Sequence, residues 1–388
     1  VTLGSEVRRI VCLAADRAGS IWVGTWGAGL DRIRPGSSLF QTVVSHSGDG
    51  GLEDQEVTPL LVDRRNRLWV GGTIGAMIRL DLETGRHETF PQIDNSALDF
   101  HEDRDGKIWA GTPAGLDRLD PSTETLTEYR HDPEDPGSLG RGWVWAVLRD
   151  REERLWVGTG EGGLNLLLPD GSFRRFANDP ADRYSLSENY VTALHQDGAG
   201  RIWVGTRSGG LNRFDPATGR FHRFQPDAQD ELSISHHYVS SILEDRRGRL
   251  WIGTGGGGIN LLHFGNDADR PVGFTRFTER EGLVDDNVMS MMEDDDSSLW
   301  IATRQGLSRF DTERLLFVNY DTADGLPGRE FNQGSVAGNR ESIFFGTNRG
   351  AVGVARGAPF PTPEPSPVVM TSIESPHGVI AGDRPSWE

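Results

Sequence analysis

Cysteine, basic residues and long apolar runs are all scarce in this chain of 388 residues. Cys12 is the only cysteine, which excludes a disulfide framework and a thiolate metal cluster. No segment approaches the ~18 apolar residues of a membrane span, and no charged-then-apolar signal peptide opens the chain. The formal charge is −18, from 40 Lys and Arg against 58 Asp and Glu. This balance argues against nucleic acid or an anionic membrane surface as a partner, because both need a basic face.

Glycine, by contrast, is abundant. The chain has 50 glycines and 20 prolines, and 36% of its residues are hydrophobic. Such a chain can bury a large core but is rich in turn residues. The composition therefore favours an all-β fold.

The stretch 201–216 shows how the glycines are used, and it reads R-I-W-V-G-T-R-S-G-G-L-N-R-F-D-P. Residues 202–206 are apolar, with β-branched and aromatic side chains, and are typical of a strand. The Ser-Gly-Gly that follows permits a reversal, and residues 211–214 alternate apolar and polar as a second strand does. Further strands are predicted at 191–194 and 221–224. The unit is a four-stranded antiparallel meander of about 40 to 50 residues, the size of one propeller blade.

This unit recurs along the chain. Each copy has a tryptophan that follows an aspartate by six residues and precedes a small-residue doublet, and successive copies are 40 to 49 residues apart. The tryptophans in this register are Trp22, Trp69, Trp109, Trp156, Trp203, Trp251 and Trp300. A divergent eighth copy has Gly338 in the aspartate position and Phe344 in the tryptophan position. We predict an all-β fold, a β-propeller over residues 1–358 with seven or eight four-stranded antiparallel blades.

The repeated tryptophan and aspartate are predicted to belong to the scaffold. A single blade cannot bury both faces of its sheet, so neighbouring blades must stack, and a tryptophan at one register suits that stacking. The aspartate ends the innermost strand, where its carboxylate can bond turn amides two residues on. Residues 103–106, Asp-Arg-Asp-Gly, resemble part of a calcium loop that lacks its other acidic ligands. His101 and His195 are expected to be packed in the core or channel, so we predict no metal and no cofactor.

The sequence changes character after residue 358. Residues 359–367 are rich in proline and predict a stiff, extended linker. Residues 368–388 open with an apolar run that predicts the first strand of a further β domain, truncated here.

The unit D-x-x-G-x-L-W-V-G-T-x-x-G-G-L-N-R-F-D-P closely resembles the two-component regulator propeller repeat of bacterial sensor proteins, and the resemblance covers nearly the whole chain. Residues 132–139 and 179–187 are similar to the inter-repeat segment of that family. The sequence from 330–332 through 344–347 to 368–373 resembles its last blade, followed by the start of a three-tyrosine, immunoglobulin-like domain.

The resemblance implies a periplasmic or otherwise extracytoplasmic sensor that recognises glycans or other small molecules. In the whole protein it implies a membrane span and a kinase or cyclase beyond this chain, and a homodimer. Propellers of this family are commonly paired and seven-bladed. Eight copies therefore imply either an eight-bladed ring or one terminal copy that belongs to a neighbouring propeller.

Ligand-binding residues are expected on one face of the ring. The loop between the second and third strands of a blade and the loop into the next blade emerge on the same face, and these loops vary most between copies. Their side chains suit a hydroxylated or acidic saccharide, because aromatic rings stack on sugar faces and guanidinium groups pair with carboxylates. The predicted ligand-binding residues are Trp26, Arg141, Trp143, Tyr190, Arg207, His236, His237, Tyr238, Asn287, Arg304, Asn332 and Arg349.

Two other functional classes remain alternatives to a ligand-binding, non-enzymatic sensor. In a polysaccharide lyase, His236, His237 and Tyr238 could supply the base and acid for elimination across a uronic acid, with Arg207 neutralising its carboxylate. No serine nucleophile elbow, P-loop or HExxH motif is present. The third class is a protein-interaction scaffold, because one fold hosts many functions.

Overall fold

The computed structural model describes residues 39–42, 56–72, 77–90, 97–265 and 271–360, together with the backbone of five short strands outside these ranges. The chain divides into two compact units, Val1–Ala358 and Pro359–Glu388. In the second unit, β32 (Ile373–Ser375) pairs with β33 (Gly378–Ile380). The immunoglobulin-like character of that unit stays a prediction. Within the described parts, no helix is both long and apolar enough to cross a membrane.

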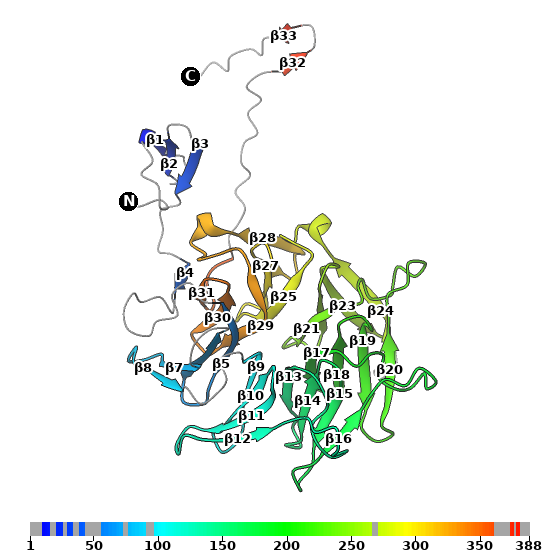
Figure 1. Ribbon diagram of the computed structural model, residues 1–388. Helices are drawn as coiled ribbons and strands as arrows, with labels where there is room; N and C mark the ends of the chain where they lie inside the picture. The colour runs from blue at the N-terminus through cyan, green and yellow to red at the C-terminus, as the bar shows by residue number, and fades with distance from the viewer. Residues whose placement is uncertain are drawn as a thin grey trace. The chain divides into compact units, whose positions relative to one another are not determined.

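Seven four-stranded antiparallel sheets are arranged in a ring, as Figure 1 shows. Residues of their innermost strands line a central channel. Each blade is a meander whose strands follow in order from the channel to the rim. Blade one contains β5 (Val57–Val62), β6 (Arg67–Gly72), β7 (Met77–Asp81) and β8 (His87–Phe90). Blade two contains β9 (Asp99–Glu102), β10 (Ile108–Thr112), β11 (Gly115–Asp120) and β12 (Thr125–Tyr129). Blade three contains β13 (Val144–Arg149), β14 (Leu155–Thr159), β15 (Gly163–Leu167) and β16 (Phe173–Phe176).

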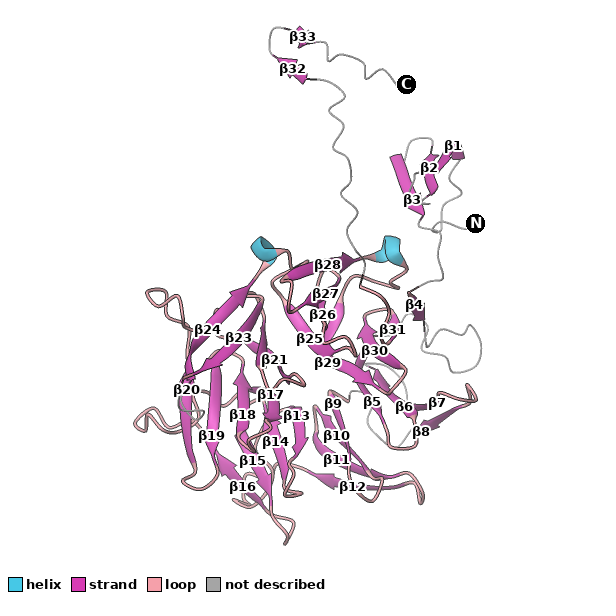
Figure 2. Cartoon of the chain, turned by 180° about the vertical axis from the view of Figure 1, so that it is seen from behind, coloured by secondary structure: helices cyan, strands magenta, loops and turns pink. Residues whose placement is uncertain are grey.

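Blades four to six continue the same pattern. Blade four contains β17 (Val191–Gln196), β18 (Ile202–Thr206), β19 (Leu211–Asp215) and β20 (Arg220–Phe224). Blade five contains β21 (Val239–Glu244), β22 (Leu250–Thr254), β23 (Ile259–Phe264) and β24 (Pro271–Phe277). Blade six contains β25 (Val288–Glu293), β26 (Leu299–Thr303), β27 (Leu307–Asp311) and β28 (Leu316–Tyr320). Two short 3-10 turns, η1 (Glu279–Glu281) and η2 (Thr322–Asp324), stand out among the strands in Figure 2.

The seventh blade closes the ring with a strand from near the start of the chain. It consists of β29 (Phe331–Gly338), β30 (Ser342–Thr347), β31 (Gly350–Ala355) and, at the rim, β4 (Phe40–Thr42). Val354 faces Phe40 across the antiparallel β31–β4 pair. The edge of β31 is thereby covered, which removes an unpaired strand edge from the ring.

The ring therefore has seven blades, and the eight-bladed alternative is wrong. The first repeat copy contributes only β4 to the ring. Its other strands, β1 (Ile10–Ala15), β2 (Ile21–Thr25) and β3 (Gly29–Ile33), pair with one another in a separate three-stranded sheet.

The recurring tryptophan lies in the interface between blades, as predicted. Trp203 of blade four is fully buried and packs in one apolar cluster with Val239, Leu250 and Ile252 of blade five. The ring of Phe264, also from blade five, lies 6.4 Å from the Trp203 ring. Because each blade repeats this arrangement, burial of one apolar face requires the next blade.

The recurring aspartate has the predicted turn role and a second role that the sequence did not indicate. Oδ1 of Asp197 accepts hydrogen bonds from the backbone N–H groups of Ala199, at 3.1 Å, and Arg201, at 2.9 Å. Oδ2 accepts the indole N–H of Trp203 at 2.8 Å. The same tryptophan–aspartate bond occurs in blades one to six. One carboxylate thus fixes both the turn and the interfacial ring.

Candidate functional site

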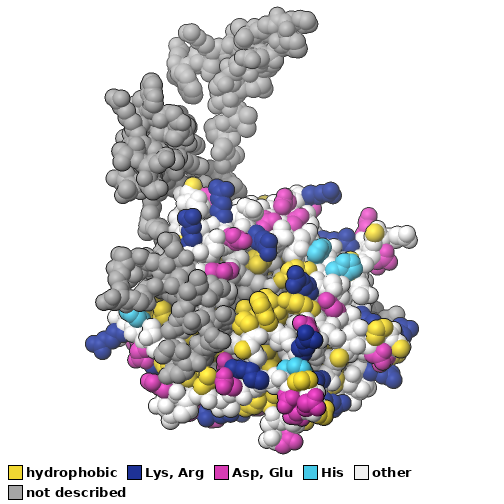
Figure 3. Space-filling view, viewed as in Figure 1, with side chains coloured by type: hydrophobic (Ala, Val, Ile, Leu, Met, Phe, Trp, Pro, Cys, Tyr) yellow, Lys and Arg dark blue, Asp and Glu magenta, His cyan; other side chains and the backbone are white. Residues whose placement is uncertain are grey.

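The loops predicted to share a face do so. The N–H of Arg207, in the glycine-rich loop of blade four, donates to the carbonyl of Tyr190, in the loop that enters this blade, at 3.0 Å. The equivalent bond from Gly255 to Tyr238 in blade five is also 3.0 Å. We call this face the loop face and the opposite one, with the aspartate turns, the turn face. Figure 3 shows apolar side chains near the middle of the ring, with basic side chains around them.

An aromatic row runs from the rim of the channel into its mouth. Trp143 is 50% exposed and stacks on Trp145, with ring centroids 5.5 Å apart and planes at 27°. The Trp145 ring lies 5.9 Å from Tyr190, and the guanidinium of Arg207 lies 5.0 Å from the Tyr190 ring. Trp145 was not among the residues predicted from the sequence. The alternation Trp-Val-Trp into β13 was the available signal, because residues two apart on a strand share a side.

Gln333 crosses the channel below this mouth, and no feature of the repeat pattern predicts this position. The ladder between β29 and β30 shifts register between Phe331 and Val336, so this segment leaves the blade. The side-chain amide of Gln333 donates to the carbonyls of Thr192, at 3.2 Å, and Ser240, at 3.3 Å. Its side-chain carbonyl accepts a hydrogen bond from the hydroxyl of Tyr238. Blade seven is thereby tied across the channel to blades four and five.

The channel around Gln333 holds a cavity of about 180 Å³, lined by Asp99, Trp145 and Ser290 among others. Burial raises the pKa of Asp99 to about 7, although its carboxylate accepts the N–H groups of Val147, at 2.7 Å, and Phe100, at 2.8 Å. The hydroxyl of Ser290 and the indole N–H of Trp145 have no hydrogen-bond partner among the described residues. The channel is therefore polar rather than a sealed apolar core.

Two arginines at the mouth, Arg207 and Arg304, form no ion pair within the described part of the chain. Both are close enough to Tyr238 to counteract the rise in its pKa, whose main cause is burial of the phenol. In a chain with a net charge of −18, these two arginines have no ion-pair partner among the described residues, and one of them lies over the half-buried Tyr190 ring. They form a site suited to an anionic ring-bearing ligand.

Several other predicted residues are engaged locally. Arg141 pairs with Glu161 at 3.0 Å on the surface. The amide of Asn287 donates to Asp285 at 2.9 Å. Asn332 is only 8% exposed and its amide donates to the carbonyl of Val57 at 2.8 Å, so it joins blade seven to blade one. The N–H of Arg349 donates to the Thr347 hydroxyl.

The histidine pair lies in the loop that enters blade five. Nδ1 of His236 accepts the N–H of Tyr238 at 3.1 Å, and the rings of His236 and His237 are 6.5 Å apart. The Tyr238 hydroxyl is bonded to Gln333 rather than to either imidazole. Trp26 lies outside the described residues.

No three His, Cys, Asp or Glu side chains gather as metal ligands would within the ranges that the structure describes. Oδ1 of Asp103 instead accepts the turn N–H of Asp105 at 3.0 Å. Desolvation lowers the pKa of His101 and His195 to about 4, and both imidazoles are neutral near pH 7.

The fold and the site define a seven-bladed β-propeller with a polar, aromatic channel mouth. The model of the two component regulator propeller family matches residues 4–27, 185–208, 233–256 and 282–305. Four segments of the chain thus match the two-component regulator propeller repeat, and the resemblance found in the sequence is confirmed for them. A segment of 75 residues, 19% of this chain, is 31% identical to Histidine kinase P4 of Formosa agariphila and corresponds to 6% of that protein.

Two solved structures with the same fold differ in their described function. The extracellular domain of the hybrid two component system BT3049 from B. thetaiotaomicron matches 91% of this chain with a TM-score of 0.70 and 23% identity. This chain spans 46% of that domain, less than half its length. Virginiamycin B lyase from Staphylococcus aureus, solved in an inactive form with quinupristin, matches 81% of this chain and 99% of its own, with a TM-score of 0.62 and 11% identity.

Proposed function

We propose that this propeller is the ligand-binding, extracytoplasmic sensor domain of a bacterial signal-transduction protein. The repeat family and the fold shared with an extracellular sensor domain support this proposal. Signalling would pass through a membrane span and an output module outside this chain, in a homodimer of the full-length protein.

The ligand proposed for the channel mouth is a saccharide or another small molecule with a carboxylate. One observation carries this proposal: Trp143, Trp145 and Tyr190 form an aromatic row that ends at Arg207. Arg207 and Arg304 both lie near Tyr238, and no ion pair neutralises either of them among the described residues. Aromatic rings would stack on the ring of the ligand, and a guanidinium would bind its carboxylate through two parallel hydrogen bonds.

A thermal-shift screen against neutral and uronic-acid oligosaccharides, followed by calorimetric titration of the hits, tests the proposal. Arg207→Ala should weaken binding of an acidic oligosaccharide by roughly tenfold or more, since a hydrogen bond to a charged group contributes about 1.5–3 kcal/mol. Tyr238→Phe removes only the hydroxyl, which is preferable to truncation because the Tyr238 ring packs against Gly255.

The chain offers a matched control for Arg207. Arg220, on the outer strand β20, lies 4.8 Å from the ring of Tyr184, in the same cation–π arrangement as Arg207 and Tyr190. Arg220→Ala should leave ligand binding unchanged. If Arg207→Ala and Tyr238→Phe both bind as tightly as the parent, the mouth is not the ligand site.

A lyase is the second candidate, favoured by the fold shared with virginiamycin B lyase and by the position of His236 beside Tyr238 at the mouth. If the protein releases unsaturated products from a uronic-acid polysaccharide, measured by ultraviolet absorbance, it is a lyase and the binding-only proposal is wrong. Capture of a protein partner without any small-molecule response would favour a scaffold instead.

A further inference from the structure

The divergent copy in blade seven reverses the charge at one position of the turn face. In blades one to six an aspartate ends the innermost strand and accepts the tryptophan N–H. In blade seven, Gly338 replaces this aspartate. Nη2 of Arg356 lies so close to Gly338 that it would be 2.7 Å from the Cβ of any larger residue there. A guanidinium therefore lies beside the position where the other blades have a carboxylate.

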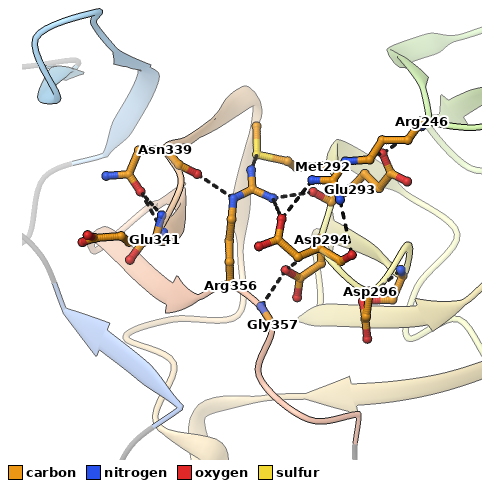
Figure 4. A network of polar contacts seen from close by, with 12 residues as sticks. Arg246, Met292, Glu293, Asp294, Asp296, Asn339, Glu341, Arg356 and Gly357 are labelled. Atoms are coloured by element: carbon orange, nitrogen blue, oxygen red, sulfur yellow. Dashed lines mark hydrogen bonds and ion pairs between the residues drawn. The ribbon is translucent and has the colours of Figure 1, made fainter.

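Two backbone carbonyls make the short contacts that hold this guanidinium in place (Figure 4). Nε of Arg356 donates to the carbonyl of Asn339 at 2.7 Å, and Nη1 donates to the carbonyl of Glu293 at 2.8 Å. The side chain is only 12% exposed, and the carboxylate of Asp295 is 3.8 Å away. Because Asp295 forms its closer ion pair with Arg246, at 2.9 Å, it compensates the charge of Arg356 only in part, and a further anion nearby lowers the energy of this largely buried cation.

Arg356 lines a cavity of about 730 Å³ at the turn face, and three other arginines line it too. Arg64 comes from blade one, Arg246 from blade five and Arg340 from blade seven. Nη1 of Arg64 donates to the carbonyl of Arg104 at 3.1 Å. Arg340 is exposed and has no hydrogen bond or ion pair within the described residues.

The carboxylates of the cavity neutralise these arginines only in part. Asp63 is committed to Trp69 and Arg67. Asp295 pairs with Arg246 at 2.9 Å. Glu341 is the remaining acid of the lining. Asp295 also lies 3.8 Å from Arg356. Within the lining, the exposed guanidinium groups of Arg64 and Arg340 therefore outnumber the one uncommitted carboxylate, Glu341, in a protein whose net charge is strongly negative.

We propose that this cavity is a second binding site, which takes an oxyanion group such as a sulfate, a phosphate or a carboxylate. Guanidinium groups suit such ligands because their planar N–H fork matches two oxygens at once. The site lies on the turn face, away from the aromatic mouth, and its existence does not depend on the ligand proposed there.

Three sodium salts test this proposal on the complete chain: sulfate, phosphate and malonate. Binding is measured by calorimetric titration and by thermal unfolding, with sodium chloride at matched ionic strength. The double variant Arg64→Gln/Arg340→Gln removes two exposed charges and leaves the packed Arg356 in place. We expect at least one of the three anions to bind the parent, and the double variant to bind it roughly tenfold more weakly.

Two controls separate this site from general salt effects and from the mouth. Arg280→Gln neutralises an exposed arginine in η1, outside the cavity lining, and should bind the anion as the parent does. Sulfate and phosphate also stabilise proteins by exclusion from their surface, and that effect is equal in all variants. Arg207→Ala should likewise leave anion binding intact.

Three results would overturn the proposal. The first is that none of the three anions binds the parent. The second is that the double variant binds as tightly as the parent. The third is that Arg207→Ala abolishes the binding, which would assign the anion to the mouth. Failure of saccharide binding at the mouth, by contrast, would leave the cavity result unaffected.

Discussion

The indole N–H of Trp203 donates a hydrogen bond of 2.8 Å to Oδ2 of Asp197, six residues earlier in the chain. The same carboxylate holds the turn through Oδ1. The ring of Trp203 is fully buried between blades four and five. One residue pair thus sets the geometry of the turn and the packing of two blades together, which explains why the two residues recur as a unit.

Trp203→Ala should lower the free energy of unfolding by about 3–5 kcal/mol, the usual cost of removing a large buried aromatic side chain. Trp203→Phe keeps an apolar ring but leaves Asp197 without its indole partner, and should cost about 1–3 kcal/mol. Urea unfolding measures both. A neutral Trp203→Ala would contradict the interfacial role, and equal losses in both variants would show that the ring contributes little beyond its N–H.

Phe40→Ala should destabilise the ring closure. Phe40 is 3% exposed, and its ring lies 5.2 Å from Tyr320 and 6.2 Å from Trp300 of blade six. We expect a loss of about 3–5 kcal/mol in the free energy of unfolding. We also expect self-association by size-exclusion chromatography, because the edge of β31 becomes available. Gln41→Ala, at an exposed position of the same strand, is the control and should behave as the parent.

Gln333→Ala should uncouple blade seven from blades four and five. The variant loses hydrogen bonds to Thr192, Ser240 and Tyr238, and should cost about 1–3 kcal/mol because the Tyr238 hydroxyl loses its acceptor. A double-mutant cycle with Tyr238→Phe measures the coupling by urea unfolding, and we expect about 0.5–3 kcal/mol. Additive losses would mean that the tie across the channel is not formed in solution.

The titration of the Asp99 carboxyl group should lower the free energy of unfolding as the pH rises. Its folded pKa, about 7, lies above the ordinary value of 3.8 for an aspartate, so the folded state binds the proton more tightly than the unfolded state does. This contribution is complete below pH ~4 and is lost as the pH rises through ~7. Asp99→Asn mimics the protonated acid and should remove this slope.

His101 and His195 act in the opposite direction, because their pKa values of about 4 lie below the ordinary value of 6.5 for a histidine. Their contribution is complete above pH ~6.5 and is lost toward pH ~4. The difference in the free energy of unfolding between the parent and Asp99→Asn therefore isolates the carboxyl group, when it is measured from pH 4 to 8. A difference independent of pH would show that Asp99 is ionised throughout.

The sequence by itself determined the structure of a single blade, a four-stranded antiparallel meander. Short strands and glycine turns follow from local backbone preferences, and the recurrence of Trp203 and its equivalents at one register showed that blades pack on one another. It also placed Tyr190, Arg207 and Tyr238 on one face, because the direction of each loop follows from counting antiparallel strands. A repeat pattern carries such information since every copy obeys the same local rules.

Only the tertiary structure decided what depends on contacts between distant copies. The number of blades was one such question, because eight copies give seven blades once β4 pairs with β31. The reach of Gln333 across the channel, and the position of Arg356 beside Gly338, join residues that no periodicity relates. A repeat fixes how each copy folds and stacks on its neighbours. The closure of the ring depends instead on the total twist of all the blades, and the chemistry of the channel and turn face depends on the residues that depart from the repeat.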